Sequence, residues 1–180
     1  EDPRRQRQMC IRDRPWGGGN LFITNLKNYL ESKGNKVIFD LFDGDIDIIL
    51  IIDPRMLSES VIYSIKDIQF YKRRINSECK VVHRINECDE RKGTSGINKY
   101  YIEANKIADY TVFVSEWLKN TFIKSGFSSK NNEVIMSGSD SEIFNDDGRL
   151  FWDGTEPLKI VTHHWGCLLY TSDAADEDLR

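Results

Sequence analysis

The sequence predicts an α/β fold in which a parallel sheet carries helices on both faces. Apolar runs of strand length alternate with segments of helical periodicity, which is typical of consecutive βαβ units. The most hydrophobic run, 46–52, is rich in β-branched residues and ends at Asp53-Pro54, as expected for a central strand buried on both faces. Polar clusters follow these runs, at the sheet edge where such folds bind their ligands.

The first element is a glycine run that leads into a helix. We expect residues 17–19 to form a loop, Asn20 to cap a helix of regularly spaced apolar residues, and Gly34 to end that helix. Free N–H groups at such a helix N-terminus bind anions, so the loop is a candidate phosphate site. A flexible surface turn is the alternative. The dinucleotide-binding fingerprint is absent, because Phe22 stands where its third glycine is required.

The remaining elements alternate along the chain. Strands are expected at 37–42, 46–52, 81–85, 110–114 and 133–136, and helices at 58–76, 97–108 and 116–124. Ser115 is a suitable N-cap for the last helix, and Gly126 is its stop. The polar segment 86–96 predicts a loop. Right-handed crossovers between these strands place the helices on both faces of the sheet.

The two ends of the chain resemble translated sequencing adapters. Residues 9–14 (MCIRDR) match what a transposon-based adapter encodes, and residues 167–177 (CLLYTSDAADE) match the same adapter read from the complementary strand. We therefore expect 1–14 and 167–180 to be adapter-derived artefact and the first natural strand to be truncated.

Between these ends we expect a domain at 15–145 and a second, truncated domain that begins with a strand at 158–166. The polar, glycine-containing segment 146–157 would be the linker between the two domains.

Composition narrows the class of protein. The formal net charge is −4, with 25 Lys and Arg against 29 Asp and Glu, and the basic residues do not cluster as nucleic-acid binding requires. We therefore expect no nucleic-acid partner. No apolar run approaches the roughly 20 residues of a membrane span. Cys79 and Cys88 have neither metal-ligand spacing nor a disulfide framework, which favours a reducing, cytoplasmic compartment.

The pair His83 and Arg84, at the end of a strand, is a candidate for contact with an anion or a sugar. The imidazole can donate or accept a hydrogen bond, and the guanidinium can hold a carboxylate or phosphate through two N–H groups. The alternative is that Arg84 simply pairs with Glu87 or Asp89. The adjacent histidines near the C-terminus would point to opposite faces of a strand and lack a third ligand, so no metal is expected.

Four segments together resemble the N-terminal domain of family-4-like glycosyltransferases of the GT-B fold. They are 15–22 (PWGGGNLF), 31–37 (ESKGNKV), 108–118 (ADYTVFVSEWL) and 133–144 (EVIMSGSDSEIF), and the resemblance covers essentially all of 15–166. The last segment departs from the family pattern of Asn-Gly-Val-Asp followed by Phe. Ser137 replaces the asparagine, whereas the glycine, the aspartate and Phe144 are kept.

The resemblance implies a fragment of a retaining glycosyltransferase of polysaccharide biosynthesis, inactive as truncated. Two Rossmann-like domains would transfer a sugar from a nucleotide diphosphate sugar to a glycan or lipid-linked acceptor. No metal and no cofactor beyond this co-substrate would be needed, and peripheral contact with the inner face of a membrane is an option. The donor phosphate and sugar would face Gly17, Gly18, Gly19 and Asn20. The acceptor-side cleft would be lined by His83, Arg84, Asn86, Glu87, Ser115, Ser137, Gly138 and Asp140.

A self-contained, doubly wound binding or regulatory domain without catalysis is the alternative.

Overall fold

The computed structural model describes residues 17–55, 61–128, 130–139, 141, 143–157 and 159. Its centre is a four-stranded sheet in the order β1-β2-β3-β4, and every neighbouring pair of strands is parallel. The strands are β1 (Ile48–Ile51), β2 (Lys80–Ile85), β3 (Tyr110–Phe113) and β4 (Asn132–Val134). The prediction of an α/β, Rossmann-like parallel sheet is therefore confirmed.

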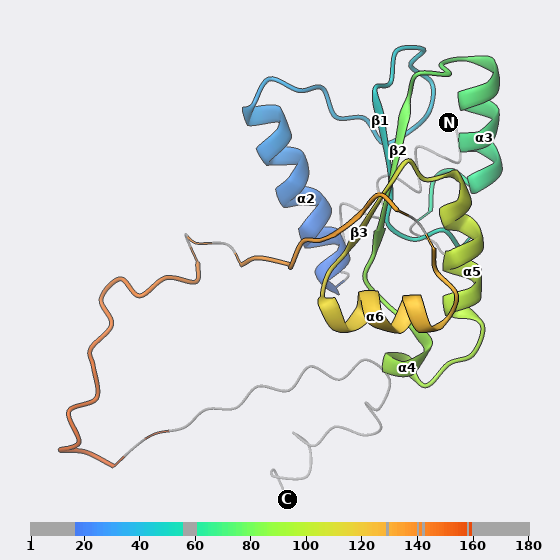
Figure 1. The fold of residues 1–180 in the computed structure, drawn as a ribbon. Coiled ribbons are helices and arrows are strands. Elements are labelled where there is room, and N and C mark those ends of the chain that lie inside the picture. The colour runs from blue at the N-terminus through green and yellow to red at the C-terminus, as the bar shows by residue number, and fades with distance from the viewer. Residues whose placement is uncertain are drawn as a thin grey trace, which may run out of the picture.

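Helices lie on both faces of the sheet (Figure 1). Helix α2 is on one face, and α3 and α5 are on the other. The helical segments are α2 (Gly17–Ser32), α3 (Ile65–Arg74), α4 (Asp89–Lys92), α5 (Ile97–Ala104), the 3-10 turn η1 (Asn105–Ile107) and α6 (Glu116–Lys124). None of the described helices combines the length and apolar character that a membrane crossing needs.

Two apolar clusters form the core on the face that carries α3 and α5. The first joins α3 to β1 and β2, and consists of Ile49, Ile51, Ile68, Tyr71, Cys79 and Val81. The second joins α5 and α6 to β2 and β3, and consists of Ile85, Cys88, Tyr101, Phe113, Leu118, Phe122 and Phe127. Aromatic rings hold the second cluster together, because the ring centroid of Phe113 lies 5.8 Å from that of Phe122 and 5.0 Å from that of Phe127.

Local signals in the sequence placed several helix ends correctly. The backbone N–H of Leu118 donates to Ser115 Oγ (3.1 Å), which is the predicted cap of α6. Gly34 has a φ of +82°, and Asn35 N–H donates to Leu30 C=O behind it, which closes α2 in a Schellman arrangement.

The start of α2 differs from the prediction. The helix begins at Gly17, so residues 17–19 are helical and do not form a loop. Asn20 consequently lies inside the first turns and is not the N-cap. A helix can begin on glycines because the N–H groups of its first turn need no partner within the helix, although each glycine costs about 1 kcal/mol relative to alanine.

The segment before β1 also differs from the prediction. The structure has no strand at 37–42; instead Leu41 packs against the cluster under α3, and Asp40 Oδ1 accepts a hydrogen bond from the Phe42 N–H in a local turn. The strand β1 is therefore an edge strand of the described sheet and not the central one, and the side chain of Ile48 is 63 % exposed.

Smaller differences concern where helices begin and end. Helix α3 begins at Ile65, because Ser64 and Asp67 form a reciprocal capping box. The expected loop 86–96 contains the single turn α4, and the expected helix 97–108 ends as the 3-10 turn η1. Residues 146–157 contain neither helix nor strand. The expected strand at 158–166 and the adapter-like ends lie outside the described residues apart from Lys159, so the domain boundaries stay predictions.

Replacing Phe122 with alanine tests the aromatic core. Phe122 is fully buried between Phe113 and Tyr101, so Phe122→Ala should lower the free energy of unfolding by about 3–5 kcal/mol. The neighbouring Ile123 is 49 % exposed, and Ile123→Ala should cost less than about 1 kcal/mol. Urea unfolding followed by circular dichroism measures both. Equal losses for the two variants would contradict this packing.

Candidate anion-binding site

A cavity of about 280 Å³ lies around the carboxyl end of β1. Helix α2 contributes Gly19 and Ile23 to its wall, and the segment before α3 contributes Val61 and Tyr63. Residues that follow β1 and β2 close the remaining sides, including Asn86. The cavity therefore lies at the edge of the sheet where ligands of parallel α/β folds bind.

A cluster of charged side chains joins the ends of β1 and β2 beside this cavity. The Arg55 guanidinium donates to both oxygens of Asp53, with Nε–Oδ1 and Nη2–Oδ2 distances of 2.8 Å. Its Nη1 lies 2.9 Å from Glu87 Oε1. Glu87 also accepts hydrogen bonds from Tyr101 Oη (3.2 Å) and from Lys92 Nζ. Each charge in this cluster is matched, which indicates a role in holding the two strand ends together.

The directions of the pKa shifts of Arg55 and Tyr101 agree with that role. The hydrogen bond to Asp53 raises the pKa of Arg55 above its usual range, against the opposing effect of burial. Burial raises the pKa of Tyr101, and the carboxylates of Asp53 and Glu87 raise it further. The phenol therefore stays protonated at neutral pH and acts as a hydrogen-bond donor.

His83 is fully buried on the face that carries α5 and does not line the cavity. Its Nδ1 lies 2.9 Å from Asn105 Oδ1, which also accepts a hydrogen bond from Thr111 Oγ1 (2.9 Å). Nδ1 is thus the protonated nitrogen, and Nε2 has no hydrogen-bond partner among the described residues. Burial lowers the pKa of His83 to about 4, although the hydrogen bond to Asn105 opposes this change. The imidazole is therefore neutral at pH 7 and is part of the packed core.

Arg84 points to the opposite face of the sheet, toward α2. Its guanidinium carbon lies 3.9 Å from the ring centroid of Phe22, and Nη2 donates to Ser137 Oγ (3.1 Å). The residue is only 8 % exposed, yet no carboxylate within the described ranges pairs with it. The alternative pairing of Arg84 with Glu87 or Asp89 is wrong. Burial lowers the pKa of Arg84 from its usual value, without removing its charge at neutral pH.

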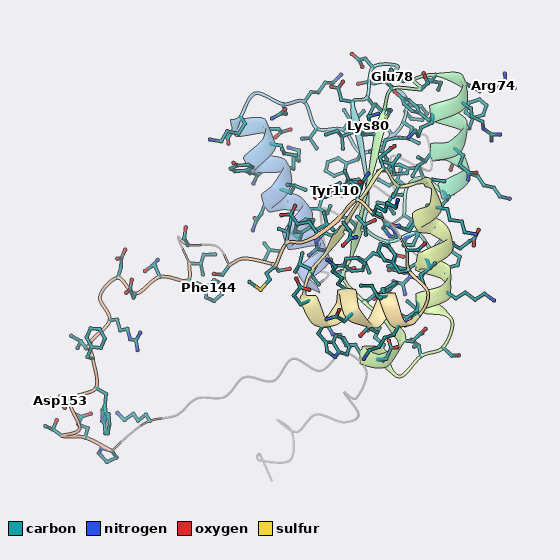
Figure 2. The ribbon with its side chains drawn as sticks, viewed as in Figure 1. Arg74, Glu78, Lys80, Tyr110, Phe144 and Asp153 are labelled. Atoms are coloured by element: carbon teal, nitrogen blue, oxygen red, sulfur yellow. The ribbon has the colours of Figure 1, made fainter. Side chains whose placement is uncertain are left out.

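The other predicted site residues fall into separate places. Gly19, Asn86 and Glu87 meet at the cavity, whereas Ser115 is used as the cap of α6. Gly17, Gly18 and Asn20 belong to the first turn of α2, Gly138 is exposed, and Asp140 lies outside the described residues. Phe144 is 69 % exposed and lies on the segment that leaves the sheet (Figure 2).

Sequence reasoning missed three contributors to this region. Arg55 and Tyr101 reach Glu87 from distant parts of the chain, and Phe22 supports Arg84 from α2. The polar triplet at 53–55 directly after a strand was the available signal for Arg55. Within the part of the chain that the structure describes, no group of three or more His, Cys, Asp or Glu side chains is arranged to hold a metal ion.

The pH dependence of unfolding tests the buried histidine. The pKa of His83 is lowered from 6.5 in the unfolded chain to about 4 in the folded protein, so protons bind preferentially to the unfolded state between these values. Stability is therefore full above pH 6.5 and should fall by about 3 kcal/mol toward pH 4, where the loss levels off. Urea unfolding of wild type and His83→Leu, compared across this range, measures the difference. An imidazole NMR titration with a midpoint near 6.5 would contradict it.

Removing Glu87 tests the charged cluster. Glu87→Ala deprives Arg55, Tyr101 and Lys92 of their shared acceptor and should lower the free energy of unfolding by about 3 kcal/mol. Glu103, which is exposed and pairs only with Lys106 among the described residues, provides the control; Glu103→Ala should cost less than about 1 kcal/mol. Chemical denaturation of both variants at pH 7 distinguishes them, and a loss as small as that of Glu103→Ala would refute the structural role.

Comparison with known proteins gives one informative similarity. No protein-family model matches the chain, and no solved structure matches it. The chain is similar to the RecBCD enzyme subunit RecB of Borreliella burgdorferi, with 29 % identity over 162 residues. The match covers 70 % of this chain but only 13 % of RecB, so the chain spans a small part of that relative's length.

This similarity overturns the functional expectation drawn from the family resemblance. It points to a subunit of the RecBCD enzyme and away from a retaining glycosyltransferase of polysaccharide biosynthesis. The expected partners, a nucleotide sugar and a glycan or lipid-linked acceptor, are wrong on the same finding, and so is the exclusion of nucleic acid. RecB is a subunit of an enzyme, so the similarity supports the expectation of an enzyme. It does not support the expected glycosyltransferase activity.

Proposed function

We propose that this chain is a nucleic-acid-binding domain of an enzyme, in which Arg84 contacts a backbone phosphate. The observation that carries the proposal is a guanidinium that is 8 % exposed and has no carboxylate partner among the described residues. By contrast Glu87, the other buried charged side chain at this edge among the described residues, forms ion pairs with Arg55 and Lys92.

Burying an unmatched charge is costly, because the side chain gives up its hydration without gaining an opposite charge. A bound anion compensates for that cost. Arginine suits a phosphate in particular, since its planar guanidinium can donate two parallel hydrogen bonds to two phosphate oxygens. The ring of Phe22 and the hydroxyl of Ser137 hold the guanidinium in place, so little side-chain freedom is lost when the ligand binds.

The position of Arg84 in the fold also favours an anion. It lies near the carboxyl end of β2, an inner strand, and contacts α2 two turns or fewer from the helix N-terminus at Gly17. A ligand that extends from Arg84 to the first turn of α2 would also meet the positive end of the helix dipole.

The similarity to RecB is what favours nucleic acid as the source of the phosphate. The chain has a formal net charge of −4, so binding would come from a local site and not from a broad basic surface. A single phosphate contact predicts a shallow salt dependence, in which the logarithm of the binding constant falls with a slope of about −1 against the logarithm of salt concentration.

Substitution of Arg84 tests the proposal. Binding of a fluorescein-labelled single-stranded oligonucleotide, followed by anisotropy, should weaken about tenfold or more in Arg84→Gln and less in Arg84→Lys. Arg74, exposed at the C-terminal end of α3 (Figure 2), provides a matched control, and Arg74→Gln should bind as wild type does. The free energy of unfolding of Arg84→Gln should be no lower than that of wild type, because the variant removes an unmatched charge.

Two results would overturn the proposal. One is that the wild-type chain fails to bind the oligonucleotide at low salt. The other is that Arg84→Gln and Arg74→Gln bind equally well, which would mean that any affinity comes from elsewhere on the protein.

A further inference from the structure

We infer that the cavity beside Arg84 accepts one unstacked nucleobase, so that the preferred ligand is single-stranded nucleic acid. This inference rests on the proposed function and names the form of nucleic acid that the same site takes. It comes from the position of the cavity at the same edge of the sheet as Arg84, from the apolar part of its lining and from its size.

Arg84 does not line the cavity, but residues adjacent to it and to its contact Phe22 do. Phe22, which contacts the guanidinium, is followed in α2 by Ile23, which lines the cavity. Ile52, another wall residue, lies one position beyond the paired residues Ile51 and His83, and is therefore beside Arg84 on the same face of the sheet. A phosphate held by Arg84 would thus have its own base within reach of the cavity.

The lining suits the two kinds of surface that a base presents. A nucleobase has apolar faces and a polar edge. The faces would meet apolar wall residues such as Ile23, Ile52 and Val61. The edge would meet Asn86, whose amide can both donate and accept hydrogen bonds and so suits the mixed donors and acceptors of a base. The charged wall residues Asp53, Arg55 and Glu87 are paired with one another and form part of the polar lining.

Size and access favour a single base. A volume of about 280 Å³ lies just below the roughly 300–1,000 Å³ of typical ligand pockets, which suits a ligand the size of one base. In a duplex the base would first have to leave its stack, which costs a few kcal/mol. In a single strand this cost is small, and every base has an apolar face that can stack or pack in the cavity, whatever the sequence.

Three oligonucleotides of equal length distinguish the base from the phosphate. They are an intact single strand, the same strand with abasic sites throughout, and the duplex. Anisotropy at fixed low salt should show about tenfold weaker binding for the abasic strand and for the duplex. Equal binding of all three, with Arg84→Gln still defective, would overturn this inference and leave the proposed function standing. Absence of any binding would overturn both.

Filling the cavity gives a second test. Gly19 faces open space, since a Cβ added there meets nothing within 4 Å, and leucine is a better helix former than glycine. Gly19→Leu should therefore fold, and should weaken binding of the intact strand about tenfold without changing binding of the abasic strand. Asn28→Leu adds the same side chain to an exposed position of α2 outside the cavity and should bind as wild type does. Unchanged binding of the intact strand by Gly19→Leu would refute the assignment of the cavity.

Discussion

The alternation of side chains along β2 separates the core of this protein from its candidate site. β2 pairs with a strand on each side, so its register is fixed twice and its residues cannot exchange faces without breaking both ladders. Val81, His83 and Ile85 consequently enter the core under α3 and α5, whereas Arg84 turns toward α2. His83 and Arg84 are adjacent in sequence, but the neutral histidine packs in the core, whereas the arginine, which has no carboxylate partner among the described residues, belongs to the candidate site.

Local features of the sequence were sufficient to predict the parts of the fold that depend on local interactions. Helix α6 begins after its serine cap at Ser115 and ends before a glycine, and both signals lie within a few residues of the helix. The inner strands β2 and β3 were predicted nearly to the residue, because a short β-branched run between polar segments has few other ways to bury its side chains.

The strand order and the contacts of the site depend on residues far apart in the chain, and these were not predictable in the same way. An apolar run such as 46–52 has the same composition at the edge or the centre of a sheet, and only its neighbours decide which it is. The pairing of Arg55 with Glu87 likewise requires the two loops to be adjacent in space. The opposite directions of His83 and Arg84, however, followed from the period of a strand and could have been predicted.

The outer edge of β1 bears on how this protein behaves at high concentration. Among the described residues no strand pairs with that side of β1, and Ile48 exposes an apolar side chain there. The Tyr63 hydroxyl donates to Leu50 C=O, so a side chain already occupies one backbone group of β1. A sheet edge with apolar side chains is a template on which another chain can add a strand. Replacing Ile48 with lysine would place a charge on this edge without touching the cavity or Arg84.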